Sequence, residues 1–535
     1  MQDSKTIRAL MLMLALAITA CLRGDNKAAV VAAAFDDSYA EEYGQNQTTA
    51  TSVPSFTPVE GADLSARLEA ASRRGRAGQT PYWSAYSFDV RSGVAVDPGV
   101  REFHGSMNNV GDTTVFIGTT ASGMAVETRN LGIFLLRTPG NNEISRMEVY
   151  NLERKREYGG YPVYWLGRSN NEESLNYLRD LSDSAQVNLL SERAVLGISL
   201  HDDPRVASLL KNFIKTAKSP RLRSSSIYWL GQVGGEQQFL ADIVRNESED
   251  RNLRRQAAHA IGEGRDRGSL ALLQTLYDTV KDVEVKRGII RAAGNSREQP
   301  EAIAFLLKVA RNDPDTQARR TAVRQIGEFE NASIVEELMK IYASDPAAEV
   351  KSDVLHALAE TNSPGAQPRL LNLARTEPNP ELRKRAIRVL AERGEAVVAD
   401  LISLFDSERM PEVRRTVLQS LSEIKGPRVE DKLFAVASAD GNLELRRQAI
   451  RLLGERAGKR SLDFLSSTAQ NDGNTEVQIQ AVRAISERNA EEAVPLLIKI
   501  AKTHANEMVR KQAIRALGES GDPRTVEFFR ELMAK

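Results

Sequence analysis

The side chains best suited to catalysis or metal binding are few in this chain and do not gather in the sequence. There is one cysteine, Cys21, and the five histidines are scattered singly. The sequence holds no GxSxG, Walker or HExxH motif, and carboxylates are so frequent that no single pair stands out. One cysteine permits neither an internal disulfide nor a cysteine-based zinc site. We therefore expect no enzyme, no catalytic residue, no metal site and no cofactor.

Charged side chains instead recur at fixed places in an eleven-residue motif that occurs twelve times. The clearest copies are VRKQAIRALGE (Val509–Glu519), LRRQAIRLLGE (Leu445–Glu455) and LRKRAIRVLAE (Leu382–Glu392). Successive copies begin 31 to 33 residues apart, which is typical of a solenoid, an array of stacked repeats. The copies begin at Tyr158, Leu190, Leu222, Leu253, Val285, Ala318, Val350, Leu382, Val413, Leu445, Val477 and Val509.

These charges predict rows of like side chains, because motif positions 3, 7 and 11 are four residues apart and share one helix face. Positions 3 and 7 are mostly basic, and position 11 is usually glutamate. One interpretation is a partly basic groove that grips an extended or acidic segment of another protein. The other is that arginine and glutamate on this face pair with each other, at about 0.2–0.5 kcal/mol per pair. The candidate partner-binding arginines are Arg324, Arg388, Arg447, Arg451 and Arg515.

Two aromatic segments break the pattern. PVYWLG (Pro162–Gly167) and SIYWLG (Ser226–Gly231) are near copies two repeats apart, which predicts equivalent places for their rings. Tyrosine and tryptophan are favoured anchors in binding sites, so these rings are further candidates for partner binding. The alternative is that they pack against the neighbouring strands or against each other. The residues concerned are Tyr164, Trp165, Tyr228 and Trp229.

Each repeat is expected to be a pair of helices. Motif positions 1, 5 and 9 are mostly apolar, as in Val509, Ala513 and Leu517, and this spacing gives one buried helix face. Position 10 is always small, which lets a neighbouring helix approach closely. A second amphipathic stretch such as Ala493–Lys502 follows, and then a reversal such as Asp345–Val350, whose polar residues supply helix N-caps.

The repeat resembles the HEAT repeat in its short bacterial form, named for the phycobilin lyases. The resemblance rests on VRKQAIRALGESGDP (Val509–Pro523) and its copies, and it covers residues 158–535. It implies an α-solenoid of about twelve repeats of about 32 residues, with the motif helices on the concave side. Among HEAT-like enzymes, deoxyhypusine hydroxylase binds iron through His-Glu pairs, but no histidine here precedes a glutamate. Phycobilin lyases act inside the cell, so a lyase or metal-hydroxylase activity is the least favoured alternative.

Residues 59–157 predict a small β-rich module that covers the exposed first repeat. Leu64–Arg74 has the pattern of a short amphipathic helix. Strand patterns follow, and the last two flank TPGNN, whose proline, glycine and asparagines suit a tight reversal and so predict a hairpin. The expected strands are Trp83–Val90, Thr113–Gly118, Leu131–Leu136 and Ile144–Tyr150.

The first 21 residues predict export. Lys5 and Arg8 precede an apolar run, Ala9–Ala17, which is too short to span a membrane and is typical of a signal peptide. Ile-Thr-Ala-Cys then resembles the lipobox of bacterial lipoproteins, which implies that Cys21 carries the lipid; the alternative is an ordinary cleaved signal. Residues 22–58 lack apolar periodicity and predict a disordered tether. We expect a protein of the cell envelope or periplasm, anchored to a membrane through Cys21.

Charge limits the classes of partner. Lys plus Arg equals Asp plus Glu, at 72 each, and a net charge of zero argues against nucleic acid. The partner's identity and the oligomeric state are left open. We predict an all-α solenoid preceded by a β-rich module, acting as a non-catalytic envelope scaffold that binds a protein through the solenoid. The alternative is a structural or regulatory accessory subunit of an envelope enzyme or transporter complex, contacting it through the β-rich module.

Overall fold

The computed structural model describes residues 56–97, 103–110, 113–120, 127–140, 142–184, 188–264, 266–295, 299–329, 333–361, 363–456 and 458–534. The predicted signal peptide with Cys21, and nearly all of the predicted tether, lie outside these residues. The chain divides into two compact units. The first, here called the sheet unit, holds the residues up to Asp89 and Thr128–Ser174. The second, the solenoid unit, holds Val90–Glu127 and the chain from Leu175 onward.

The sheet unit contains a five-stranded sheet and helix α4 (Leu64–Ala77), which the Asp63 side chain caps by accepting from the Ala66 backbone N–H. Strand β8 runs parallel to its neighbours β1 and β2, whereas β2, β6 and β7 are antiparallel. The predicted helix and the predicted hairpin of β6 and β7 are confirmed. In order across the sheet, the strands are β1 (Thr57–Pro58), β8 (Val163–Arg168), β2 (Tyr82–Ser87), β6 (Leu131–Arg137) and β7 (Ile144–Asn151).

The first predicted repeat, Tyr158–Arg168, is not a helix. Its first residues form a short 3-10 turn, η2 (Tyr158–Gly160), and its YWLG sequence lies in β8. Gly159 and Gly160 have φ of 67° and 73°, and Pro162 has no backbone N–H, so the residues before YWLG break a helix. Pairing with β1 and β2 then holds the segment extended. Strand β1 itself comes from the last two residues of the predicted tether.

The solenoid unit includes a small antiparallel sheet in the order β3 (Ala95–Val96), β5 (Thr113–Thr120) and β4 (Phe103–Val110). The sequence predicted β5 but not β4, because FHGSMNNV has too few apolar residues to stand out. The chain that leads into this sheet is bonded to the helices, since Arg91 Nη1 donates to the Gln232 carbonyl oxygen at 2.9 Å. The strands of the predicted module therefore form two sheets, in different compact units.

After α5 (Asn171–Ser184), in which the division between the two units falls, the chain alternates between motif helices and partner helices. The eleven motif copies from Leu190 onward are all helical, as predicted. The motif helices are α6 (Asn188–Ser199), α8 (Pro220–Val233), α10 (Arg251–Glu263), α12 (Val283–Gly294), α14 (Thr316–Gly327), α16 (Ala348–Glu360), α18 (Pro380–Ala391), α20 (Pro411–Ser422), α22 (Leu443–Gly454), α24 (Thr475–Ser486) and α26 (Glu507–Glu519). The partner helices are α7 (Arg205–Thr216), α9 (Gln237–Arg245), α11 (Ser269–Thr279), α13 (Gln299–Asn312), α15 (Ser333–Ser344), α17 (Ala366–Thr376), α19 (Val398–Ser407, after the 3-10 turn η3, Gly394–Val397), α21 (Pro427–Ala439), α23 (Lys459–Asn471), α25 (Ala490–Thr503) and α27 (Arg524–Met533).

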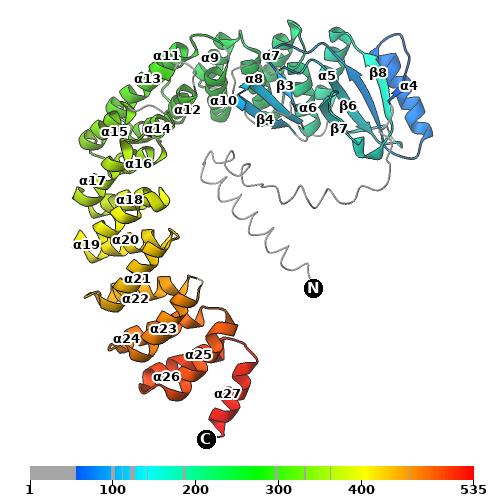
Figure 1. The fold of residues 1–535 in the computed structure, drawn as a ribbon. Helices are drawn as coiled ribbons and strands as arrows, with labels where there is room; N and C mark the ends of the chain where they lie inside the picture. The colour runs from blue at the N-terminus through cyan, green and yellow to red at the C-terminus, as the bar shows by residue number, and fades with distance from the viewer. Residues whose placement is uncertain are drawn as a thin grey trace. The chain divides into compact units, whose positions relative to one another are not determined.

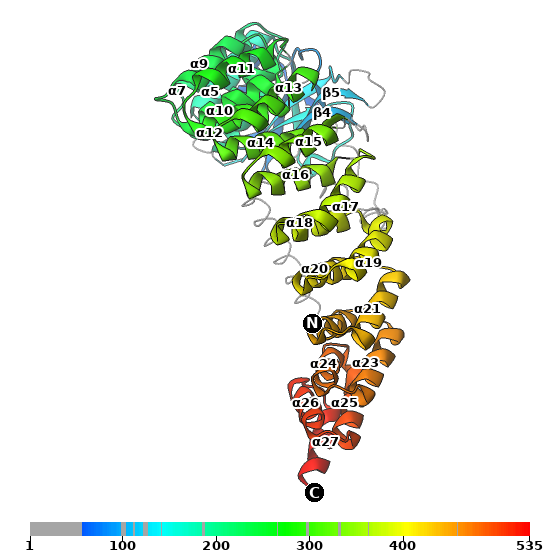
Figure 2. The same ribbon diagram turned by 90° about the vertical axis from the view of Figure 1, so that its left-hand side faces the viewer.

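The helices stack in two rows, with motif helices packed on motif helices in one row and partner helices following one another in the other (Figures 1 and 2). Motif positions 1, 5 and 9 face the core, as the fully buried Val509, Ala513 and Leu517 show. A glycine at position 10 permits close packing, since a Cβ added at Gly231 would lie 2.7 Å from the Ala260 carbonyl oxygen. The solenoid unit is thus an array of HEAT-like helix pairs, and the fold class is as predicted.

Polar residues in most of the reversals begin the motif helices, as predicted. The predicted example, Asp345–Val350, is an exception, because the N-cap of α16 is Ala347 and no side chain caps the helix. Asn442 is representative: its side chain accepts hydrogen bonds from the backbone N–H groups of Glu444 at 2.9 Å and Leu445 at 3.2 Å. Asp315 and Asn474 cap α14 and α24 in the same way. Such caps satisfy backbone donors that have no partner within the helix, at about 1 kcal/mol each.

Candidate functional site

One set of arginines links each repeat to the next, at motif position 2. Arg319 in α14 is representative: its Nε donates to Asp345 Oδ2 at 2.7 Å, and its Nη1 donates to the Asp313 carbonyl oxygen at 3.0 Å. The two charged side chains are 11% and 5% exposed. The equivalent pairs are Arg223–Glu249, Arg383–Glu408, Arg414–Asp440 and Arg446–Asp472. These largely buried pairs link successive repeats, and we did not predict them.

A second set of arginines follows the motif and caps the preceding motif helix. Arg456 Nη2 donates to the carbonyl oxygens of Ser422 and Ile424, both at 2.8 Å, at the end of α20. Arg393 reaches the end of α16 in the same way, through the carbonyl oxygen of Leu358 at 3.1 Å. These guanidinium groups occupy carbonyls that a helix end leaves without partners, so they too serve the fold.

The predicted rows at positions 3 and 7 lie on the motif helices, but they do not have the same surroundings along the array. In α14, Arg320 Nε donates to Asp353 Oδ2 at 2.6 Å, and Arg324 Nη2 donates to Asp353 Oδ1 at 3.1 Å. The Asp353 side chain, from α16, is only 8% exposed. One buried carboxylate therefore holds both arginines, including the predicted site residue Arg324, and offsets one of their two positive charges.

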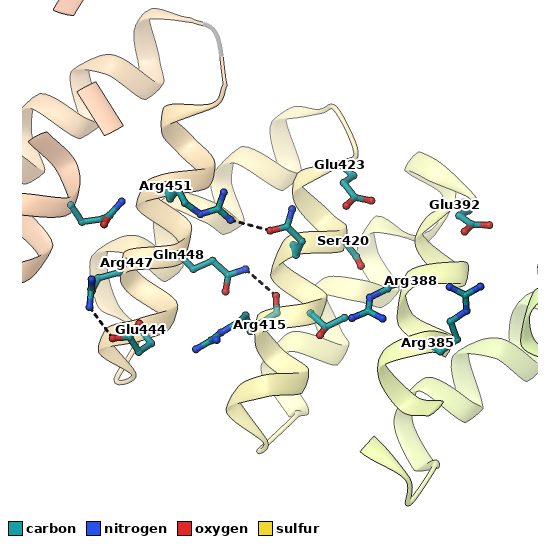
Figure 3. A pocket seen from close by; sticks show the side chains of 13 residues that line it. Arg385, Arg388, Glu392, Arg415, Ser420, Glu423, Glu444, Arg447, Gln448 and Arg451 are labelled. Atoms are coloured by element: carbon teal, nitrogen blue, oxygen red, sulfur yellow. Dashed lines mark hydrogen bonds and ion pairs between the residues drawn. The ribbon is translucent and has the colours of Figure 1, made fainter. Parts of the chain in front are cut away.

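Further along the array, the motif helices α18, α20 and α22 form a groove of about 670 Å³. Figure 3 shows arginines from all three helices on one side of the array, with Glu392 and Glu423 along an edge. The groove brings together three of the predicted site residues, Arg388, Arg447 and Arg451. The charged residues that line it are Arg385, Arg388, Glu392, Arg415, Glu423, Glu444, Arg447 and Arg451.

The groove arginines differ in whether another side chain of the protein pairs with them. Arg447 Nη1 donates to Glu444 at 2.9 Å, and Arg451 pairs with Glu455 while its Nη2 donates to Gln419 at 3.1 Å. By contrast, no hydrogen bond or ion pair within the described residues engages the side chains of Arg385, Arg388 and Arg415. The Nε atom of Arg385 is buried without a partner. Three guanidinium groups therefore face the groove with their donors available.

Arg515, the last of the predicted arginines, lies outside the groove on α26. Its Nε donates to Glu519 at 2.9 Å, and the two side chains are 72% and 66% exposed. This is the pairing of arginine with a glutamate four residues later, which was the alternative interpretation of the charged rows. An exposed pair of this kind contributes well under 1 kcal/mol to folding.

The structure does not make the two aromatic segments equivalent. In β8, the Tyr164 ring lies edge-on to that of Tyr82, with the ring centres 5.5 Å apart. The Trp165 ring stacks on that of Phe56, with the ring centres 5.4 Å apart. In α8, Trp229 is 1% exposed and therefore belongs to the core of the array. The equivalence predicted from sequence is wrong, because one copy of YWLG is a strand and the other a helix.

Tyr228 is half-buried and lines a hollow of about 910 Å³ along α8 and α10. Its ring lies edge-on to that of Trp229, with the ring centres 5.0 Å apart.

Titratable groups within the described residues do not assemble into a metal-binding cluster. No group of three or more His, Cys, Asp or Glu side chains suited to a metal occurs in this part of the chain. Burial lowers the pKa of His201 to about 4, and its Nδ1 lies 2.8 Å from the Gly197 carbonyl oxygen in the core. None of the helices described is both long and apolar enough to cross a bilayer.

The repeats and the groove define a helical-repeat solenoid with a polar, partly basic groove. A family profile of HEAT repeats matches residues 238–316, 303–380, 367–454 and 462–535, which together make up more than half of the chain. The chain belongs to the HEAT-repeat family. None of the curated proteins matches it.

Several solved structures are similar in fold. Yeast importin-β (Kap95p) is 12% identical, with 67% of this chain and 56% of that chain covered and a TM-score of 0.34. Kap121p is 13% identical, with 68% and 47% covered and a TM-score of 0.38. Human deoxyhypusine hydroxylase is 16% identical, with 53% and 96% covered and a TM-score of 0.21. The chain matches about half the length of the two importin-type structures, and similarities this low have no bearing on its function.

Proposed function

We propose that this protein is a non-catalytic scaffold that binds a protein partner through the groove of α18, α20 and α22. The observation that carries this proposal is the contrast between arginines. Those at motif position 2 are buried against acids, whereas Arg385, Arg388 and Arg415 line an open groove with no partner in the described part of the chain. Guanidinium groups bind carboxylates strongly and with defined geometry, so the groove is suited to acidic side chains.

The lining favours a polypeptide over a nucleic acid. Glu392, Glu423 and Glu444 stand among the arginines and would repel a continuous row of phosphates. The lining also contains no aromatic ring on which a base can stack. It does contain Gln419, Gln448 and other polar groups that can hydrogen-bond a peptide backbone. An extended segment with acids at intervals fits this mixture best.

The binding proposal is tested by reversing the charge of the two exposed groove arginines, in the double variant Arg388→Glu, Arg415→Glu. Partners crosslinked to the native protein in its own cells are identified by quantitative mass spectrometry. We expect one partner to be lost from the double variant and kept by the matched control Arg515→Glu, whose pair lies outside the groove. Equal recovery of every partner by the wild type and both variants would refute the role of the groove.

We further propose that the scaffold works in the cell envelope, held to a membrane through a lipid on Cys21. This part of the proposal rests on the basic start, the short apolar run and the Ile-Thr-Ala-Cys sequence. At least two acyl chains are needed for stable anchoring, and a lipidated N-terminal cysteine supplies them. Mass spectrometry of the native N-terminus is the test. An acylated Cys21 is expected, and an unmodified N-terminus at any other residue would exclude the anchor.

A further inference from the structure

A second basic site lies earlier on the same face, between α10 and α12. It is a hollow of about 300 Å³. Arg255 and His259 stand at motif positions 3 and 7 of α10, as Arg415 and Gln419 do in α20, and Arg291 stands at position 7 of α12. The lining residues are Asn252, Arg255, Gln256, His259, Gly288 and Arg291.

This hollow carries excess positive charge. Burial, and then the neighbouring cations Arg255, Arg287 and Arg324, lower the pKa of Arg291. No ion pair or hydrogen bond within the described residues engages the Arg291 side chain. The acidic side chains nearby already have partners. Glu284 Oε1 accepts a hydrogen bond from Arg287 Nη1 at 2.5 Å, and Glu263 Oε1 lies 3.4 Å from His259 Nε2.

Two sequence differences keep this hollow open and basic. Position 11 of α12 is Asn295 rather than the usual glutamate, so one acid is missing beside Arg291. Position 4 of the same helix is Gly288, and a Cβ there would lie 3.0 Å from Arg255 Cγ. A larger side chain at position 4 would therefore crowd Arg255 and fill the hollow. Donors from two adjacent helices can then meet at a single carboxylate.

The two basic sites are separated by a stretch whose arginines already have an acidic partner. Between them, Asp353 of α16 holds both Arg320 and Arg324 of α14. From α12 to α18 there are three steps in the row of motif helices. Neighbouring helices lie about 8–10 Å apart, so the two basic sites are about 25–30 Å apart. An extended chain of about eight or nine residues spans this distance.

We propose that these two sites together bind one extended polypeptide that carries two acidic clusters about eight or nine residues apart. One cluster lies in the α10–α12 hollow and the other in the groove of α18, α20 and α22. This inference rests on the proposed function and specifies the partner's chemistry. Joining the clusters in one chain raises the effective concentration of the second, so a bipartite segment binds more tightly than either cluster alone.

The test uses synthetic peptides and the full chain. The bipartite peptide has two Glu-Glu-Asp clusters joined by a nine-residue Gly/Ser spacer; a second peptide has one cluster, and a third has a two-residue spacer. Fluorescence anisotropy gives each affinity at one salt concentration. We expect the bipartite peptide to bind at least tenfold more tightly than the other two. Arg291→Gln should remove that advantage, while the single-cluster peptide should still bind at the groove of α18, α20 and α22.

A second variant guards against misfolding at the half-buried Arg291. Gly288→Leu fills the hollow without changing any charge, and it should also reduce the bipartite peptide to single-cluster affinity. Arg515→Glu is the control that should change nothing. Equal affinities for all three peptides would overturn the bipartite arrangement while leaving the groove intact. Equal binding of a 20-nucleotide single-stranded DNA would show a general polyanion surface, and no binding of any acidic peptide would reject the groove as well.

Discussion

The segment α14–α16 and the segment α18–α22 carry the same motif and the same arginine positions, yet they differ in what those arginines can do. In α14, both Arg320 and Arg324 are held by the buried carboxylate of Asp353. In α18 and α20, Arg388 and Arg415 line an open groove without such an acid. The difference lies at motif position 4 of the following helix, which is Asp353 after α14, Thr416 after α18 and Gln448 after α20. The side chain in the next repeat thus decides whether an arginine of the motif is held in an internal ion pair or is free to bind a ligand.

The largest effect should come from removing a buried link. Arg319→Ala leaves Asp345 buried without its partner, and breaking such a pair costs about 3–5 kcal/mol. Arg415→Ala, in the open segment, should change the free energy of unfolding by no more than about 0.5 kcal/mol. Urea unfolding followed by circular dichroism, with amide hydrogen exchange of α14 and α16 as the local reading, measures both. Equal losses in the two variants would abolish the distinction between the segments.

Asp353→Asn should convert the first segment toward the second. The variant weakens the charge-assisted hydrogen bonds from two arginines at a nearly buried site, at a cost of about 1–3 kcal/mol. It also releases Arg320 and Arg324, which then add positive charge between the two basic sites. We expect tighter binding of the bipartite acidic peptide, by a few-fold, despite the lower stability. Unchanged affinity would show that Asp353 does not set the boundary.

Acid should weaken the structural pairs. The hydrogen bond from Arg223 lowers the pKa of Glu249 below 4.5, the ordinary value for a glutamate. The folded protein therefore holds this proton less tightly than the unfolded chain, so the stabilisation is complete above pH 4.5 and is lost as the pH falls through the lower, folded pKa. Hydrogen exchange of α8 and α10 between pH 6 and pH 3 should show this loss in the wild type and less of it in Arg223→Ala. Identical pH profiles would contradict the assignment.

The smallest effect on stability should follow from reversing the groove arginines. Arg388→Glu, Arg415→Glu breaks no side-chain hydrogen bond or ion pair within the described residues, so the free energy of unfolding should stay within about 0.5 kcal/mol of the wild type. Affinity for the acidic peptide should nevertheless fall at least tenfold, and the salt dependence of binding should weaken. Thermal unfolding and peptide titration at two salt concentrations measure the two properties separately. Loss of both together would mean that these arginines are structural.

The period of the motif predicted the array because each copy repeats the same buried positions, such as Val509, Ala513 and Leu517. The YWLG copies show the limit of that reasoning. Trp165 lies in a strand and Trp229 in a helix, and the difference comes from Gly159, Gly160 and Pro162 and from pairing with distant strands. A non-local pairing of this kind leaves no periodic signal in the sequence.

The candidate site was predicted in part. Arg388, Arg447 and Arg451 meet in the groove, and a partly basic groove was one of the two interpretations of the sequence. Its place on α18, α20 and α22 and the availability of Arg385 and Arg415 were not predicted. The structural arginines had a readable signal, since Arg319 and Asp345, Arg414 and Asp440, and Arg446 and Asp472 are all 26 residues apart. That spacing joins a helix start to the next reversal. The role of Asp353 had no such signal, because only this copy has an acid at position 4.

The most direct test of a partner-binding groove is photo-crosslinking in the native cell. A photoreactive residue is placed at Gln419, which lines the groove, and in a matched strain at Lys340, an exposed residue on the partner helix α15. We predict that Gln419 crosslinks to one protein within an acid-rich segment, that Lys340 does not, and that Arg388→Glu, Arg415→Glu removes the crosslink. The same product from both positions, or a Gln419 crosslink that survives the charge reversal, would contradict a partner-binding groove.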